Sequence, residues 1–181
     1  YRVYAVDLLV YGGKSKPAGK KISSIGDYAV WFTALLDHYG YSDTAVAGLS
    51  YGSWLALALA RELPDRISAL IMLDPSETFA KMRSAMIWKG MRYFMFFPNR
   101  TKYAEFFEWM GGGYSDPDVD VWFEHMLDVI EYGSVGMMDV PQHRVYTRDE
   151  LHMVTMPTLV LAGSKPIIYK DPREFSAAAA N

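Results

Sequence analysis

The chain has 181 residues, of which 51% are hydrophobic and 15% aromatic, a composition that excludes an intrinsically disordered protein. Its formal net charge of −3 gives no electrostatic reason to expect nucleic acid as a partner. The absence of cysteine excludes disulfides, thiolate metal sites and a cysteine nucleophile. It also fits the reducing cytoplasm, which is the expected location, although it is compatible with secretion too. No apolar run has the length of a membrane span.

The first elements along the chain are a strand and a helix. Residues 1–9 are rich in Val, Leu and Tyr, which predicts a buried strand that ends in a glycine-containing loop. An apolar stripe over residues 25–39 predicts a helix. Ser24 is a suitable N-terminal cap for it, and Gly40 is a typical helix terminator.

The next segments alternate between strand and helix. Residues 44–49 predict a short strand, residues 51–63 a helix rich in Ala and Leu, and residues 67–73 a second buried strand. This alternation favours right-handed crossovers and a parallel sheet. The strands are apolar throughout, so helices are expected to cover both faces of the sheet.

The composition changes after residue 74. Aromatic residues and methionines accumulate there, and helices are predicted over residues 82–97, 102–110 and 119–132. Residues 156–162 then resume the sheet. The organisation predicted is an α/β core in two parts, residues 1–75 and 151–181, interrupted by a helical lid at residues 76–150. The alanine-rich end of the chain carries no argument.

One five-residue motif carries the chemistry. Gly48-Leu49-Ser50-Tyr51-Gly52 matches G-x-S-x-G between a predicted strand and a predicted helix, the setting of a nucleophile elbow. A serine in such a sharp turn has a strained backbone, and glycines two residues away on either side avoid collisions. The helix N-terminus favours negative charge, and the Tyr51 N–H is placed to donate to an oxyanion. The alternative is a chance match in an ordinary turn.

With this elbow the chain resembles the α/β-hydrolase superfamily, closest to its carboxylesterase-like branch with a helical lid. The resemblance covers nearly the whole sequence, including YRVYAVD at the start, PDRISALIMLDPSETFA after the elbow helix and MPTLVLAGSKPIIYKDP near the end. It implies a parallel-sheet α/β-hydrolase fold that is incomplete here. The family's segments with the second oxyanion donor and the catalytic histidine are not found, so we expect a fragment of a longer protein.

The partners of Ser50 are the open question. His38, His125, His143 and His152 are weak candidates for the base, because a histidine outside a site is more often a solvated or hydrogen-bonded side chain. The family's usual position for the acid, three residues after Gly163, is Pro166.

For the acid itself, the resemblance leaves Asp171 as the first candidate and Asp74 as the second. Alternatively, Asp171 caps a helix before Pro172 and Asp74 makes a turn before Pro75.

The function predicted is a serine hydrolase that cleaves a carboxylic ester or related small acyl substrate through an acyl-enzyme. No metal and no cofactor are expected, and the sequence does not indicate an oligomeric state. The alternative is a non-catalytic α/β-hydrolase-like protein that uses the same pocket for binding.

Overall fold

The computed structural model describes residues 2–9, 13–17, 19, 22–94, 99–112, 117–132, 140–164, 167–169 and 171–180. The chain forms two compact units. One unit contains the core sheet and comprises Ser23–Arg83 and Pro141–Asn181; the other, the helical unit, comprises Tyr1–Ile22 and Ser84–Val140.

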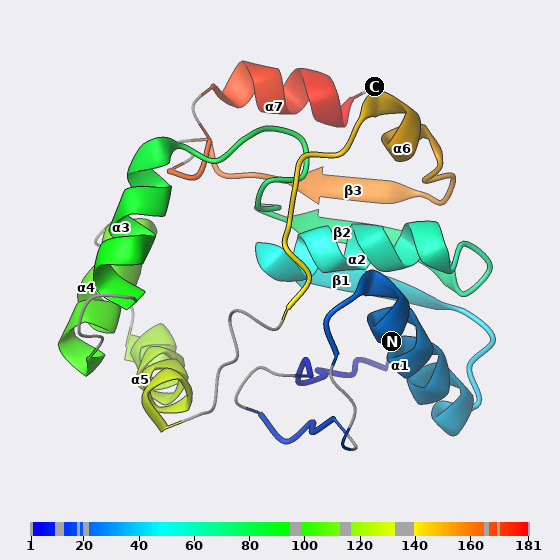
Figure 1. The fold of residues 1–181 in the computed structure, drawn as a ribbon, viewed down its shortest axis with the longest axis horizontal. Helices are drawn as coiled ribbons and strands as arrows, with labels where there is room; N and C mark the ends of the chain where they lie inside the picture. The colour runs from blue at the N-terminus through cyan, green and yellow to red at the C-terminus, as the bar shows by residue number, and fades with distance from the viewer. Residues whose placement is uncertain are drawn as a thin grey trace. The chain divides into compact units, whose positions relative to one another are not determined.

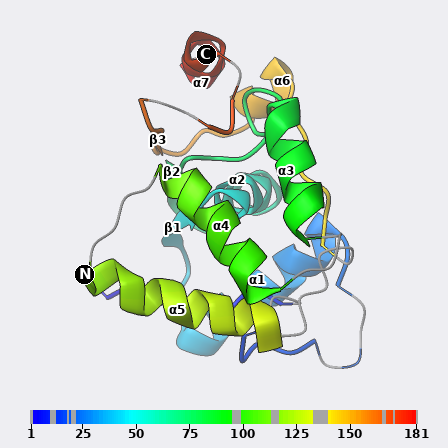
Figure 2. The ribbon, with the colours of Figure 1, turned by 90° about the vertical axis from the view of Figure 1, so that its left-hand side faces the viewer.

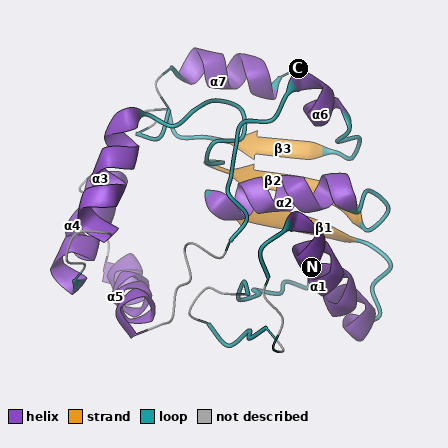
Figure 3. Cartoon of the chain, viewed as in Figure 1, coloured by secondary structure: helices purple, strands orange, loops and turns teal. Residues whose placement is uncertain are grey.

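The core unit is built on a parallel sheet of three strands in the order β1-β2-β3 (Figures 1 and 3). The strands are β1 (Thr44–Leu49), β2 (Ile67–Leu73) and β3 (Thr158–Leu161). Leu49 pairs with Leu73, and Leu73 pairs with Leu161, so the carboxyl ends of all three strands lie at one edge. The predicted parallel sheet is confirmed, and β1 and β2 have the predicted bounds.

Among the described residues, the core unit has four helices: α1 (Ile25–Tyr39), α2 (Tyr51–Glu62), α6 (Arg148–His152) and α7 (Pro172–Ala179). The predicted limits of α1 are confirmed. Ser24 and Asp27 form a capping box at its start, and Gly40 ends it with a left-handed φ of 71°. Helix α6 was not predicted, although Thr147 and Glu150 form a capping box that signals its start.

The core lies between α2 and the sheet. All residues of α2 from Trp54 to Ala60 are at most 4% exposed, as are Ile67, Leu70 and Met72 of β2. The prediction that helices cover both faces is wrong for the described residues. Leu49, Leu159 and Leu161 are 64%, 50% and 51% exposed. The reason is that, among the described helices, only α2 packs closely on the strands, and it covers one face.

The strand predicted over residues 1–9 is also wrong for its described part. Residues 2–9 form no strand, and Val3 is 86% exposed. A strand requires a neighbour whose backbone groups pair with its own, and no described strand lies beside this segment. Only Leu9 in this segment is buried.

In its described part, the helical unit contains three successive helices, α3 (Ser84–Phe94), α4 (Arg100–Gly111) and α5 (Pro117–Tyr132). These correspond to the three helices predicted after residue 76. Helix α4 contacts both α3 and α5 (Figure 2). Phe106 of α4 is buried against Phe94 of α3, with ring centroids 5.0 Å apart. None of the described helices is both long enough and apolar enough to span a membrane.

Candidate active site

Ser50 lies between the last residue of β1 and the first residue of α2. Its φ of 52° and ψ of −116° place a non-glycine residue in a disfavoured region of backbone conformation. Such strain persists only where surrounding contacts hold it, and it concentrates at functional sites. The Ser50 side chain makes no capping hydrogen bond at the start of α2. The backbone geometry is therefore that expected for a nucleophile elbow.

The two glycines of the motif have different roles. A Cβ on Gly48 would collide with the backbone of Gly52 and Ser53, so only glycine fits there. A Cβ on Gly52 would meet no atom within 4 Å. The prediction that both glycines avoid a collision is therefore supported for Gly48 alone. At Gly52, the close contact is made by its backbone, which packs against Gly48.

Ser53, which was not predicted from the sequence as a site residue, stabilises the turn through hydrogen bonds of its side chain. Its side chain is completely buried. Ser53 Oγ donates to Gly48 O at 2.5 Å and accepts from the Leu73 N–H at 3.0 Å. The hydroxyl thereby ties α2 to both β1 and β2. A polar residue inside the apolar run of α2 was the signal in the sequence.

The peptide group that follows Ser50 is held firmly. Ser50 O accepts hydrogen bonds from the backbone N–H groups of Ser53 (3.0 Å), Trp54 (3.3 Å) and Ser76 (3.3 Å). The Ser50 N–H donates to Leu73 O at 2.9 Å. Helix α2 and the loop after β2 together therefore determine the direction of this peptide group.

The two candidate acids lie in different environments. Because Leu49 pairs with Leu73, Asp74 lies directly across from Ser50 at the carboxyl edge. Asp74 has a φ of 40°, and its Oδ1 accepts from the Gly163 N–H at 2.8 Å. Asp171 is the N-terminal cap of α7; its Oδ1 accepts from the Arg173 N–H at 2.8 Å, and its side chain is 50% exposed. Pro166 lies outside the described residues.

The four histidines are spread over the chain. His38 lies in the last turn of α1, His125 in α5 of the helical unit and His152 in α6. No hydrogen bond or ring contact joins any of the described histidines to Ser50 itself. His143 contacts the residue next to Ser50: its ring lies edge-on to that of Tyr51, with centroids 5.8 Å apart.

A further polar group at this edge, missed from the sequence, is Glu77. Its φ is 42°, and its Oε2 lies 3.5 Å from His143 Nε2. Burial lowers the pKa of His143 below its ordinary value, and the charge of Glu77 partly opposes that effect. The hydroxyl of Tyr169 is buried without a hydrogen-bond partner among the described residues. Burial, together with the charges of Asp74 and Glu77, raises the pKa of Tyr169.

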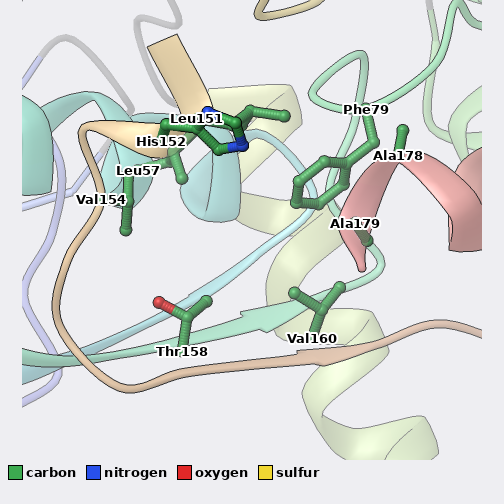
Figure 4. A pocket seen from close by; sticks show the side chains of 9 residues that line it. All are labelled: Leu57, Phe79, Leu151, His152, Val154, Thr158, Val160, Ala178 and Ala179. Atoms are coloured by element: carbon green, nitrogen blue, oxygen red, sulfur yellow. The ribbon is translucent and has the colours of Figure 1, made fainter. Parts of the chain in front are cut away.

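One pocket of about 310 Å³ lies elsewhere in the core unit (Figure 4). Its lining comes from α2, α6, β3, α7 and the loops beside them, and includes Leu57, Phe79 of the loop after β2, and Val160. His152 is its one titratable lining residue. The described lining contains neither Ser50 nor Asp74, so this pocket is separate from these two candidate site residues. Within the described part of the chain, no group of three or more His, Asp or Glu residues could hold a metal ion.

Comparison with known families identifies the family of the chain. The α/β hydrolase fold family matches residues 1–120. The chain belongs to the α/β hydrolase fold family. Along the chain, helices α3–α5 lie between strands β2 and β3 of the described sheet.

Carboxylesterases are among its similar proteins. The chain is 27% identical over 184 residues to the uncharacterized carboxylesterase nap of Bacillus subtilis, a match that covers 95% of this chain and 56% of that protein. It is 22% identical to carboxylesterase YbfK of the same organism, over 98% of this chain and 60% of that protein. The crystal structure of YbfK (CesB) superposes with a TM-score of 0.83 at 20% identity, over 99% of this chain and 62% of that chain. That likeness shows the fold. The chain thus spans less than two thirds of the length of these relatives.

Proposed function

We propose that this chain carries the nucleophile of a hydrolase that acts on carboxylic esters or related small acyl substrates. Ser50 Oγ attacks the carbonyl carbon and loses its proton to a histidine base, and the Tyr51 N–H donates to the oxyanion. Collapse of the tetrahedral intermediate expels the alcohol, which takes the proton back from the imidazolium. Water then hydrolyses the acyl-enzyme by the same steps.

The observation that carries the proposal is the backbone of Ser50. A φ of 52° at a serine, between a strand and a helix, with Gly48 packed against the backbone of Gly52, is the geometry that exposes a nucleophile. The resemblance to carboxylesterases supports an ester as the substrate. Because the chain spans only 56% and 60% of these two relatives, the activity of the whole protein is part of the proposal.

Of the two acids, we favour Asp74 for orienting the base. It lies across from Ser50 in the strand register, whereas Asp171 is engaged as a helix cap. Gly163 holds one Asp74 oxygen, and no described residue hydrogen-bonds to the other, Oδ2. The base in this proposal is a histidine beyond these 181 residues. The lid in this proposal is the segment at residues 76–150, which would exclude water from the acyl-enzyme.

An active-site probe tests the nucleophile. A fluorophosphonate should label the complete natural protein, and Ser50→Ala should abolish labelling and lower kcat for a p-nitrophenyl ester by roughly 10⁴- to 10⁶-fold. A folded protein that is neither labelled nor active would overturn the proposal and support the non-catalytic alternative.

The acid is tested with a matched pair of variants. Asp74→Asn should lower kcat by roughly 10⁴-fold, because the base loses the partner that orients it. Asp171→Asn should leave kcat within about twofold, because asparagine is an equally good cap. The reverse ranking would assign the acid to Asp171.

A further inference from the structure

The side chain of Tyr51 is fixed by a segment from a distant part of the sequence. Tyr51 Oη donates to Pro141 O at 2.9 Å. Trp54, one turn later in α2, donates from Nε1 to Arg144 O at 3.0 Å. The ring of Tyr51 stacks on Trp54 with centroids 5.7 Å apart and an interplanar angle of 26°. We call residues 141–146 the strap, since they run along the first turn of α2.

The strap is also tied to the loop after β2. The Tyr146 N–H donates to Thr78 O at 3.0 Å, and Thr78 Oγ1 donates to Ser76 O at 3.0 Å. The Ser76 N–H in turn donates to Ser50 O at 3.3 Å. These hydrogen bonds form a continuous series, which we call the circuit. It runs from the Ser50 carbonyl through the loop after β2 and the strap to the side chain of Tyr51.

This circuit holds the peptide group between Ser50 and Tyr51 from both ends. A peptide group is planar, so its N–H points opposite to its C=O. Three N–H groups fix the Ser50 carbonyl, and the strap fixes the side chain on the Tyr51 Cα. The direction of the Tyr51 N–H bond can therefore change only slightly. This matters because an oxyanion donor acts only when it is aimed at the place where charge develops.

We propose that Tyr51 is a positioning residue: its hydroxyl, bound to Pro141 O of the strap, aims the backbone N–H of the same residue at the oxyanion. This inference rests on the proposed function, because it assigns a second role to a residue of that site. His143, whose ring lies edge-on to Tyr51 at 5.8 Å and to Trp54 at 6.4 Å, adds a further contact from the strap.

The test removes the hydroxyl and nothing else. Tyr51→Phe keeps the backbone N–H and the stacked ring but loses the bond to Pro141 O. In the complete natural protein, with a p-nitrophenyl ester as the probe, kcat should fall about tenfold while KM changes less than twofold. Loss of a whole oxyanion donor costs about 10²- to 10³-fold, and misalignment of a retained donor should cost less. The rate of fluorophosphonate labelling should fall in parallel.

Tyr28→Phe is the matched control. Tyr28 is a fully buried tyrosine of α1 in the same unit, and it has no place in the proposed site. Its variant should keep kcat within twofold even if its melting temperature falls as much as that of Tyr51→Phe. The inference is overturned if Tyr51→Phe keeps the wild-type kcat, if it changes KM instead, or if Tyr28→Phe loses as much activity. A wild-type protein that neither hydrolyses the ester nor reacts with the probe would instead overturn the proposed function.

Discussion

The elbow region and the helical unit are held together in different ways. At the elbow, backbone hydrogen bonds and a fully buried Ser53 connect β1, β2 and α2, and α2 is buried along most of its length. In the helical unit, α3 has no fully buried residue, and Trp88 is 68% exposed. The helices there contact one another mainly through aromatic rings and the ion pairs of Arg100. Ser50, the proposed nucleophile, thus lies in a densely hydrogen-bonded and buried part of the core unit, whereas the first helix of the helical unit is more exposed.

The sharpest test of this difference is Gly48→Ala. The new methyl group would collide with backbone atoms of Gly52 and Ser53, which side-chain movement cannot relieve. We expect the free energy of unfolding to fall by about 4 kcal/mol or more, measured by urea denaturation.

Gly52→Ala is the control for that variant. Its Cβ would meet open space within α2, where alanine is favoured over glycine by about 1 kcal/mol. It should therefore leave the protein as stable as before or slightly more so. Equal destabilisation by both substitutions would contradict the asymmetry seen at the elbow.

A second test compares apolar residues of the two regions. Leu70 of β2 is completely buried, and Leu70→Ala should lower the free energy of unfolding by about 3 kcal/mol, because it removes buried methyl groups and leaves a cavity. Trp88→Ala in α3 removes a larger side chain that is mostly exposed, and should change stability by no more than about 0.5 kcal/mol. Thermal and urea unfolding of both variants would check this ranking. A large loss from Trp88→Ala would mean that a partner covers α3.

The same difference explains what the sequence could predict. Helix α1 and strands β1 and β2 were placed to the residue, because their limits depend on local signals such as Ser24 and Gly40. The strand over residues 1–9 was predicted wrongly, because an apolar run becomes a strand only beside a partner, and partners are not encoded locally. The prediction of Ser50 depended on a local motif and on its neighbouring elements, all of which are present.

The surroundings of Ser50 were less accessible to prediction. The strap lies about 90 residues from the elbow in sequence, and nothing in its local pattern shows that it contacts Tyr51 or that its His143 lies beside Glu77. The proposed ranking of Asp74 above Asp171 rests on the register of β1 against β2, which brings Leu49 beside Leu73. Register is a tertiary property that the sequence does not show, and the family resemblance alone ranked these two residues the other way.

A third prediction concerns the charged link within the helical unit. Arg100 of α4 pairs with Glu124, Asp128 and Glu131 of α5. These ion pairs are at the surface, and salt screens such pairs. Arg100→Gln should lower the melting temperature less than Leu70→Ala does, and the difference from wild type should shrink in 1 M NaCl. If the difference persists at high salt, packing of the arginine side chain rather than its charge would be the cause.

The smallest effect on stability is expected from the titration of His143, a partly buried residue of the strap. Burial lowers its pKa below the unfolded value of 6.5, and Glu77 partly offsets this. Between the two pKa values the unfolded state binds more protons, so this contribution to stability is complete above about pH 6.5 and declines as the pH falls toward the folded pKa. His143→Gln removes the titration. Urea denaturation at pH 7.5 and 5.5 should therefore show a smaller loss of stability on acidification for the variant than for wild type. The opposite order would mean that the ion pair with Glu77 outweighs burial, and that the strap is strengthened rather than weakened by protonation.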